Sequence, residues 1–312
     1  MFLVSGPDLV SAACRAGIVG ALPRQNVRDI ETFEKWLRQI RSEIDDFVDT
    51  HPDARIGPLA VNLATNFVED ELAANLALCK RYEVEIIISA TGNPTELARK
   101  VHDWGGVIFH DVTTMRFAEK AIAAGVDGMT CIGAGGGGHS GTISHLVLIP
   151  KIRSIFDGVI VLAGAVSNGA AIRAAEILGA DLAYLGTRFI ASQESMASAE
   201  YKSMLLSGSS ADLLYTPDMG GVPANWMTES MRAVGLDPAN LPKHSSAKMS
   251  HRHLPDGVKP WKNLWSAGQG IDLIDDVPTV AELVGRMRRE YVAACETPDM
   301  SDVARMVDAA LQ

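Results

Sequence analysis

Short apolar runs alternate with longer amphipathic runs over the first two hundred residues of the chain. The apolar runs predict strands at 18–22, 58–63, 84–90, 106–111, 128–133, 159–163 and 182–185. The amphipathic runs predict helices at 7–16, 31–44, 69–82, 94–104, 114–124, 146–156 and 169–178. Strands that are apolar throughout and separated by helices indicate a parallel sheet with both faces covered. The alternation therefore predicts an α/β protein built from repeated βα units.

Seven predicted strands are one fewer than a closed (β/α)8 barrel needs. A helix begins at Pro7, so that Phe2 to Val4 is the most that remains of a strand before it, and Gly6-Pro7-Asp8 is typical of a βα turn. We therefore expect a TIM (β/α)8 barrel whose first strand is missing or truncated, with an open seven-stranded sheet as the alternative. The resulting gap should expose unpaired edges, which predicts poor solubility or a strand taken from a neighbour.

The alternation stops after Arg188. Helices are predicted at 190–206, around 225–234 and at 280–294, and the chain between 207 and 265 is rich in Pro, Gly, Ser and Met. We expect residues 1–200 to form the cofactor-binding barrel and 201–312 to form a helical and loop extension that covers it, not a separate fold. The histidines of 243–253 lack a firm ligand spacing and a nearby carboxylate in the sequence, which favours a solvated, mobile loop over a metal site.

Charge and cysteine content narrow the class of protein. The net charge is −10 and no long basic run occurs, which argues against nucleic acid or an acidic membrane as a partner. The cysteines Cys14, Cys79, Cys131 and Cys295 form no CxxC pair, so we expect reduced thiols in a cytoplasmic protein, with Cys131 in the core. No segment has the apolar length of a membrane span, and the N-terminus lacks signal-peptide features. The expected partner is a small-molecule substrate, with a homodimer as an open option.

The densest chemical signal is the loop 133–141, in which six of nine residues are glycine and one is His139. The loop follows the apolar run Met129 to Ile132, so His139 comes just past the C-terminal end of a strand, where parallel α/β folds place their chemistry. Glycines let a flat ligand approach the backbone, and an imidazole can move a proton near neutral pH. His110 and Asp111 are second choices for a catalytic group, and the alternative for the loop is a flexible linker with a solvated histidine.

Two further loops have the character of phosphate sites. The strand at 159–163 runs into Gly164 and that at 182–185 into Gly186-Thr187. In (β/α)8 barrels the loops after the last two strands commonly hold a phosphate, through backbone N–H groups at helix N-termini. The hydroxyls of Ser167 and Thr187 are candidate donors, although Ser167 could instead cap a helix. No nucleotide P-loop or Rossmann fingerprint is present.

These glycine motifs, together with Gly179-Ala180-Asp181, the turn Leu185 to Phe189 and Trp265 to Gly270, resemble the nitronate monooxygenase family, also called 2-nitropropane dioxygenases. The resemblance implies a TIM barrel that binds FMN. It also implies that His139 is the base that takes a proton from an alkyl nitronate or nitroalkane, and that oxygen reoxidises the flavin. No metal is implied.

The resemblance carries over residue by residue to the cofactor site. Gly164 and Leu185-Gly186-Thr187 match the contacts to the FMN phosphate, Gly138 belongs to the glycine loop, and Asn62 matches a polar residue near the isoalloxazine ring. Ile132 and Gly135 stand where the family often has Gln and Glu.

Three functions compete. The favoured one is FMN-dependent oxidation of an alkyl nitronate with molecular oxygen. The second is another enzyme on the same scaffold: an NAD(P)H-dependent FMN reductase of quinones or enoyl thioesters, or a flavin-dependent oxidase of an acyl-CoA intermediate. The third is a binding module that keeps the phosphate loops and does not need His139.

Overall fold

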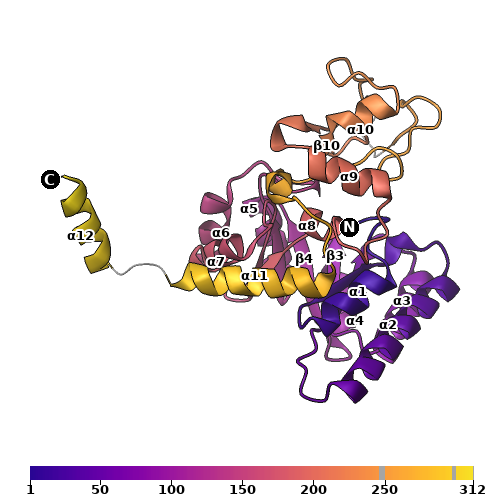
Figure 1. Ribbon diagram of the computed structural model, residues 1–312. Helices are drawn as coiled ribbons and strands as arrows, with labels where there is room; N and C mark the ends of the chain where they lie inside the picture. The colour runs from indigo at the N-terminus through magenta and orange to yellow at the C-terminus, as the bar shows by residue number, and fades with distance from the viewer. Residues whose placement is uncertain (246–249, 297–299, 312) are drawn as a thin grey trace.

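The computed structural model describes residues 1–245, 250–296 and 300–311. Its centre is a curled sheet of seven parallel strands with helices on its outside (Figure 1). The strands follow the order of the chain: β1 (Gly20–Pro23), β2 (Leu59–Ala64), β3 (Ile86–Ala90), β4 (Val107–Val112), β5 (Gly128–Ile132), β7 (Val159–Ala163) and β8 (Leu182–Tyr184). All seven predicted strands are therefore confirmed in type and position, and the fold is α/β and TIM-barrel-like.

The helices that alternate with the strands also lie where the pattern predicts them. They are α1 (Pro7–Arg15), α2 (Ile30–Thr50), α3 (Glu69–Arg81), α4 (Thr95–His102), α5 (Met115–Ala123), α6 (His145–Arg153) and α7 (Gly169–Ile177). Side-chain caps begin three of them, because Asp29, Thr114 and Asn168 accept the backbone N–H three residues on. α2 runs six residues past its predicted end, since the apolar spacing stops at the buried Ile44 although the helix continues in solvent.

Strand register separates two rows of side chains. Leu22, Val61, Ile87 and Ile108 lie side by side on neighbouring strands, and all are buried in the core beneath the helices. The residues that alternate with them point the other way, into the barrel. Because both faces of the sheet are covered by apolar groups, the strands read as continuous apolar runs.

The sheet does not close into an eight-stranded barrel. Among the described residues, β1 pairs only with β2 and β8 only with β7, which leaves a gap between the two end strands. The expected gap is thus present. Residues 2–4, the most that could remain of a first strand, form no strand, because the backbone N–H groups of Val4 and Ser5 bind the carbonyl of Met1 in a turn.

The extension differs from its prediction in two places. The helix expected at 190–206 begins only at α9 (Ala199–Ser207), which the Ser198 side chain caps, and the short helix α8 (Thr187–Ile190) ends where the prediction starts. The helix expected at 225–234 is the strand β10 (Ala224–Met227) followed by α10 (Thr228–Ala233). β10 lies between β9 (Leu213–Thr216) and β6 (Gly138–His139) in an antiparallel sheet, so that long-range pairing overrides the local pattern. The final predicted helix is confirmed as α11 (Val280–Cys295), and α12 (Met300–Ala310) lies apart from the barrel (Figure 1).

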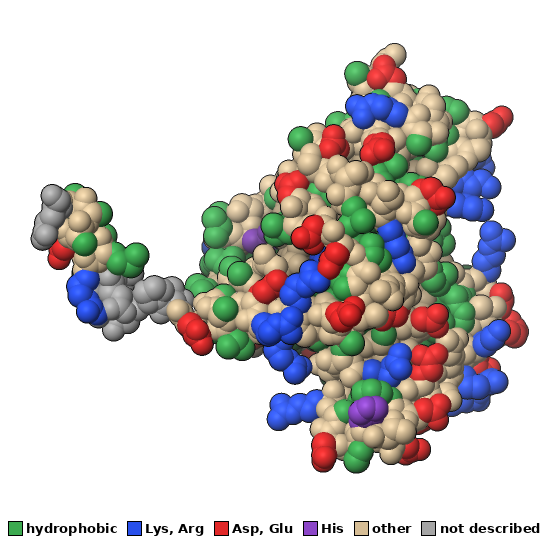
Figure 2. Space-filling model, viewed as in Figure 1, with side chains coloured by type: hydrophobic (Ala, Val, Ile, Leu, Met, Phe, Trp, Pro, Cys, Tyr) green, Lys and Arg blue, Asp and Glu red, His purple; other side chains and the backbone are tan. Residues whose placement is uncertain are grey.

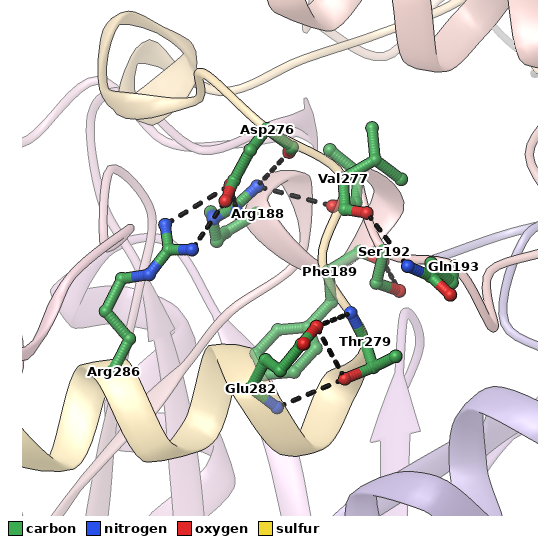
Figure 3. A network of polar contacts seen from close by, with 10 residues as sticks. Arg188, Phe189, Ser192, Gln193, Asp276, Val277, Thr279, Glu282 and Arg286 are labelled. Carbon is green, nitrogen blue, oxygen red and sulfur yellow. Dashed lines mark hydrogen bonds and ion pairs between the residues drawn. The ribbon is translucent and has the colours of Figure 1, made fainter.

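Ion pairs between the buried Arg188, the half-exposed Asp276 and the half-exposed Arg286 hold the extension to the end of the barrel (Figure 3). Arg188, 2% exposed, follows β8 and donates to Asp276 Oδ1 at 2.5 Å and to the Asp276 carbonyl at 3.1 Å. Arg286 on α11 donates to the other carboxylate oxygen at 2.5 Å. These hydrogen bonds and charges, with Arg286 the larger influence, lower the pKa of Asp276. The pairing fixes the start of α11, which packs against α7 and α1.

The surface carries charges of both signs. Acidic and basic side chains are interspersed over the face seen in Figure 2, without a broad basic patch on that face. No helix in the described part of the chain is long and apolar enough to cross a membrane. Cys14, Cys79 and Cys131 are buried free thiols, and burial raises the pKa of Cys131 to about 12, in keeping with the core role predicted for it.

Candidate active site

Three glycine-bearing segments meet around a cavity of about 180 Å³ at the carboxyl ends of the strands. They are the loop after β5, the turn after β7 and the turn after β8, and the extension closes the cavity from the other side. Six predicted site residues line it together: Gly138, His139, Gly164, Leu185, Gly186 and Thr187. Segments separated by up to fifty residues thus converge, as the strand order requires.

The glycine loop is held in place by hydrogen bonds and is not a free linker. Asn225 of β10 donates to the carbonyl of Gly136 at 2.7 Å, and the Gln269 N–H donates to that of Gly135 at 2.9 Å. The Tyr215 hydroxyl donates to the carbonyl of Ser140 at 2.8 Å. All three donors belong to the extension. The extension therefore sets the shape of the loop that carries His139.

The glycines of the cavity divide into two kinds. At Gly186 a Cβ atom would have only Met1 Cγ nearby, at 3.7 Å, and at Gly138 its nearest neighbour would be Ser266 Oγ at 3.9 Å. At Gly164 a Cβ would lie 3.0 Å from the backbone nitrogen of Gly136, and the φ of +116° disfavours any L side chain. Gly186 and Gly138 thus leave space for a ligand, although the φ of +72° at Gly138 also disfavours an L side chain, whereas a Cβ at Gly164 would meet the neighbouring loop.

The two candidate hydroxyl donors are engaged with the extension. Ser167 donates to the carbonyl of Gly270 at 2.9 Å and is buried, so it is neither a free phosphate donor nor a helix cap. The cap of α7 is Asn168. Thr187 Oγ1 accepts the N–H of Gly268 at 2.9 Å, which leaves its hydroxyl hydrogen available to a ligand in the cavity.

His139 is positioned by strand pairing. It lies on β6 opposite Ala224 of β10, and the edge of its ring faces Trp261 with the ring centroids 5.2 Å apart. Burial, and to a lesser degree the charge of His251, lower the pKa of His139 below its ordinary value. The ring is therefore neutral at pH 7 and able to accept a proton from a molecule in the cavity.

The other predicted candidates lie outside this cavity. His110 is buried and shares a hydrogen bond of 2.8 Å with the Ser89 hydroxyl, which makes it a packed rim residue. His145 Nε2 lies 2.8 Å from the carbonyl of Ala163, which gives it a structural role. Asn62 pairs in register with Ile88, which lines a second, larger cavity inside the barrel. Asp111 also lies away from the lining, with its Oδ1 buried and unpartnered among the described residues, and burial raises its pKa to about 7.

Several residues that line the cavity were not predicted from the sequence. Gly268 and Gly270 belong to the motif at 265–270 that contributes to the family resemblance, but nothing in that motif connects it to the glycine loop. Trp261 has no sequence signal at all. It reaches the cavity from the extension with a φ of +62°, and its indole also packs against Trp226 with ring centroids 4.8 Å apart.

The histidine-bearing stretch 243–253 is tied to the turn at Asp218. Lys243 Nζ lies 2.9 Å from Asp218 Oδ2, and His251 Nδ1 lies 2.8 Å from the carbonyl of Met219. The expectation that no carboxylate lies near this stretch is wrong for the folded chain, because Asp218 is distant in sequence but close in space. Residues 246–249 lie outside the described part, and among described residues no group of three ligands that could hold a metal occurs.

Comparison with known proteins supports the fold first and then the family. The solved structure of FabK from Thermotoga maritima matches with a TM-score of 0.73, covering 95% of this chain and 92% of that one at 22% identity, which is evidence for a shared fold. Residues 1–290 match the family model described as nitronate monooxygenase. The chain belongs to the nitronate monooxygenase family, and the resemblance seen in the glycine motifs is confirmed.

The curated relatives that this chain matches are named as different enzymes. A nitronate monooxygenase of Paraburkholderia phytofirmans is 25% identical over 94% of this chain and 91% of its own length. A (3aS,4S,5R,7aS)-5-hydroxy-7a-methyl-1-oxo-octahydro-1H-indene-4-carboxyl-CoA dehydrogenase of Rhodococcus jostii is 26% identical over 78% of this chain. The chain spans 63% of the length of that dehydrogenase. A relative from Mycobacterium tuberculosis is 28% identical over 53% of this chain, which spans 46% of that relative's length.

Proposed function

We propose that this chain is an FMN-dependent oxidoreductase that oxidises an alkyl nitronate, or its nitroalkane precursor, with molecular oxygen, and that His139 is its base. The observation that carries the proposal is the convergence of His139 with the glycine turns after β7 and β8 on one cavity. A ligand held by those turns would lie beside a neutral imidazole. Membership of the nitronate monooxygenase family supports the reaction class.

The residues present fit the phosphate end of FMN. Gly186 and Gly138 leave open the space that a Cβ would fill, and the Thr187 hydroxyl hydrogen is free to point into it. The turn after β8 leads into α8, in the position where (β/α)8 barrels commonly bind phosphate. A cavity of about 180 Å³ is small for a whole flavin, but Met1, Tyr184 and Leu185 line both it and the larger cavity beyond. When bound, FMN would supply the two-electron oxidation of the substrate and pass the electrons to oxygen.

His139 would act on the carbon acid. A neutral nitroalkane must lose the proton on the carbon that bears the nitro group before it is oxidised, whereas a nitronate has already lost it. An imidazole whose pKa lies below the ordinary value is neutral at pH 7, so one of its ring nitrogens is unprotonated and can accept a proton. The indole of Trp261 is in T-shaped contact with the imidazole, which limits how the ring can turn in the cavity.

The test is an anaerobic reduction experiment. The purified protein is examined for a flavin absorbance spectrum, and is then mixed without oxygen with ethyl nitronate, NADH and NADPH in turn. We expect loss of the 450 nm band with ethyl nitronate alone and its return when oxygen is admitted. Bleaching by a nicotinamide but not by the nitronate would show that the reaction class is wrong.

A second candidate function is oxidation of an acyl-CoA intermediate. It is favoured by the Rhodococcus relative, whose name is that of an acyl-CoA dehydrogenase. His139 would again be the base, since the proton beside a thioester carbonyl must also be removed. Bleaching by an acyl-CoA, with no response to ethyl nitronate, would favour this candidate over the first.

A further inference from the structure

The carboxyl group of Asp111 is a buried acid that the proposed reaction does not use. Asp111 is the next-to-last residue of β4, and Phe109, two positions earlier, lines the larger cavity of about 740 Å³ inside the barrel. Ile108 and Val112 alternate with them and are buried in the core beneath the helices. Side chains two positions apart on a strand lie on the same face of the sheet. Asp111 therefore points into the barrel, near its carboxyl end.

The groups around this carboxyl border both cavities. In the register of the sheet Asp111 lies opposite Thr130 of β5, whose side chain hydrogen-bonds the carboxyl and also lines the larger cavity. Tyr184 of β8 and the α-amino group of Met1 lie within electrostatic reach of Asp111. Both residues line the larger cavity as well as the cavity beside His139. Asp111 thus lies beside the junction of the two cavities.

One oxygen of the carboxyl has no hydrogen bond. Oδ1 is buried without a partner among the described residues, although Asp111 as a whole is partly accessible. Burial raises the pKa of Asp111 to about 7, against the hydrogen bond from Thr130 and the charge of the Met1 amine, which favour the ionised form. Tyr184 and Cys131 also feel the charge of Asp111, but burial raises the pKa of both, so neither adds a second charge. Below pH 7 the carboxyl is therefore mainly the neutral acid, with a proton that it can donate.

A purely structural role does not account for an unpaired acid in this place. At the same end of the sheet, the buried Ser89 and His110 satisfy each other through a hydrogen bond of 2.8 Å. Oδ1 of Asp111 has no such partner, and an apolar side chain would avoid the cost of burying it. Polar groups that are buried, unpaired and shifted in pKa concentrate at functional sites. The missing partner is therefore expected from a ligand.

The neutral form of the acid decides what kind of atom would satisfy it. A neutral carboxyl donates to an acceptor oxygen or nitrogen, whereas a carboxylate needs an N–H group or a cation. Both ligands of the proposed reaction carry such acceptors, since the ring of FMN has carbonyl oxygens and a nitroalkane has nitro oxygens.

We propose that Asp111 is a binding residue of the active site, which as the neutral acid donates a hydrogen bond to an acceptor oxygen of the ligand held beside His139. The inference rests on the proposed function for the identity of that ligand. It gives the site two ionisable groups with different tasks, because His139 takes up a proton whereas Asp111 keeps its own and shares it in a hydrogen bond.

The test compares FMN binding by the apoproteins of the wild type, Asp111→Asn and Asp111→Ala. Asparagine has nearly the same shape and keeps an N–H donor but cannot ionise, whereas alanine removes the donor without adding bulk. Ser89→Ala, which changes a buried polar pair outside the cavity, is the matched control. Dissociation constants are measured by fluorescence titration at about pH 6 and about pH 8.5, on either side of the pKa of Asp111. The KM for a nitroalkane is measured at the same two pH values in the reconstituted proteins.

We expect the affinity of the wild type for FMN to fall by about tenfold relative to Asp111→Asn between the two pH values, because ionisation removes the donor. Comparison with Asp111→Asn cancels the titration of the FMN phosphate itself, which both proteins share. At the lower pH, Asp111→Asn should bind within about threefold of the wild type, Asp111→Ala should bind about tenfold more weakly, and Ser89→Ala should match the wild type. If the acceptor belongs to the substrate, the same pattern appears in KM and not in the affinity for FMN.

The thermal midpoint of the apoproteins is a readout that needs neither ligand nor reaction. The folded-state pKa of Asp111 lies above the unfolded value, so the wild type loses stability as the pH rises towards the folded-state pKa. Its midpoint should therefore fall by about 3 °C more than that of Asp111→Asn between the two pH values. Equal changes in both proteins would show that the acid is not held neutral and would overturn the inference.

The binding results can overturn the inference separately from the proposed function. Equal affinities for FMN and equal KM values in the wild type, Asp111→Asn and Asp111→Ala would exclude Asp111 from the site. An affinity of the wild type that rises with pH, relative to Asp111→Asn, would show that the carboxylate accepts a hydrogen bond instead. Failure of the wild type to bind FMN at all would overturn the proposed function, and this inference with it.

Discussion

Replacement of Gly186 by valine should separate cofactor binding from folding. Gly186 has an ordinary φ of −119°, and a Cβ at this position has only Met1 Cγ within 4 Å, at 3.7 Å. The added side chain would therefore cost the fold little, well under about 1 kcal/mol, as at most surface positions. It would project into the cavity where the proposed phosphate lies. The protein should fold normally and fail to retain FMN.

The size of the effect follows from what the valine displaces. A phosphate held by backbone N–H groups and the Thr187 hydroxyl makes several charge-assisted hydrogen bonds, each worth about 1.5–3 kcal/mol. Loss of two of them is about 3–6 kcal/mol, which weakens FMN binding by roughly 10²- to 10⁴-fold. Gly186→Ala is the graded control, because its single methyl group should weaken binding less than the branched side chain does.

Gly164→Val is the contrasting variant. Its Cβ would lie 3.0 Å from the Gly136 nitrogen and 3.2 Å from His145 Cε1, at a φ of +116°. Strain of about 1–3 kcal/mol is expected for such a backbone, before any clash is counted. This variant should lose FMN together with thermal stability. The assay is fluorescence titration with FMN beside a thermal melt of each apoprotein. Wild-type affinity in Gly186→Val, or equal loss of stability in both variants, would refute the assignment.

Four further outcomes follow from the site and its supports. His139→Asn should keep FMN and reduce the rate of anaerobic flavin reduction by a neutral nitroalkane by roughly 10²- to 10⁴-fold, the usual contribution of a general base. Flavin reduction by a preformed nitronate should slow less, and equal nitroalkane rates in variant and wild type would remove His139 from the mechanism. Because burial lowers the pKa of His139, the rate with a nitroalkane should fall only when the pH drops below the ordinary histidine range, where protonation removes the base. This fall in rate at acidic pH should be absent in His139→Asn, and a fall that persists belongs to another group. Arg188→Met should lower the free energy of unfolding by about 1–3 kcal/mol in denaturant melts, because Arg188 is the buried partner of the half-exposed Asp276. Arg286→Met, which removes a half-exposed partner, should cost about 1 kcal/mol or less, and the reverse order would contradict the pairing. Trp261→Ala should raise the KM for the nitroalkane by about tenfold with bound FMN unchanged, as expected for one lost aromatic contact, and unchanged steady-state constants would exclude the indole from the substrate site.

The fold could be read from the sequence because its signals are local. Continuous apolar runs such as Val159 to Ala163 are long enough to identify a strand, and Thr114 or Asn168 marks the start of the following helix. The convergence of the loops after β5, β7 and β8 then follows from topology, since parallel strands bring their carboxyl ends to one edge. Six of the predicted site residues meet for this reason.

The remainder depends on contacts that no local pattern encodes. β10 is four residues long and is a strand only because β6 and β9 lie on either side of it, so a helix was the reasonable local interpretation of Ala224 to Met227. Trp261 reaches the cavity from more than a hundred residues beyond His139 in the chain. A second constraint on Gly164, beside the phosphate contact expected of it, was not predictable for a related reason. Its backbone neighbour is Gly136 of another loop, and only the folded chain shows that contact.

The site is shared between the barrel and the extension in a way that separates two tasks. The turns after β7 and β8, which carry Gly164 and Gly186, belong to the barrel and would hold the phosphate. The glycine loop also follows a barrel strand, but its carbonyls are bound by Asn225, Gln269 and Tyr215 of the extension. His139 itself is paired through β6 to the extension strand β10. A change that loosens the extension should therefore misplace the base while the phosphate turns remain intact, so loss of proton transfer need not bring loss of cofactor.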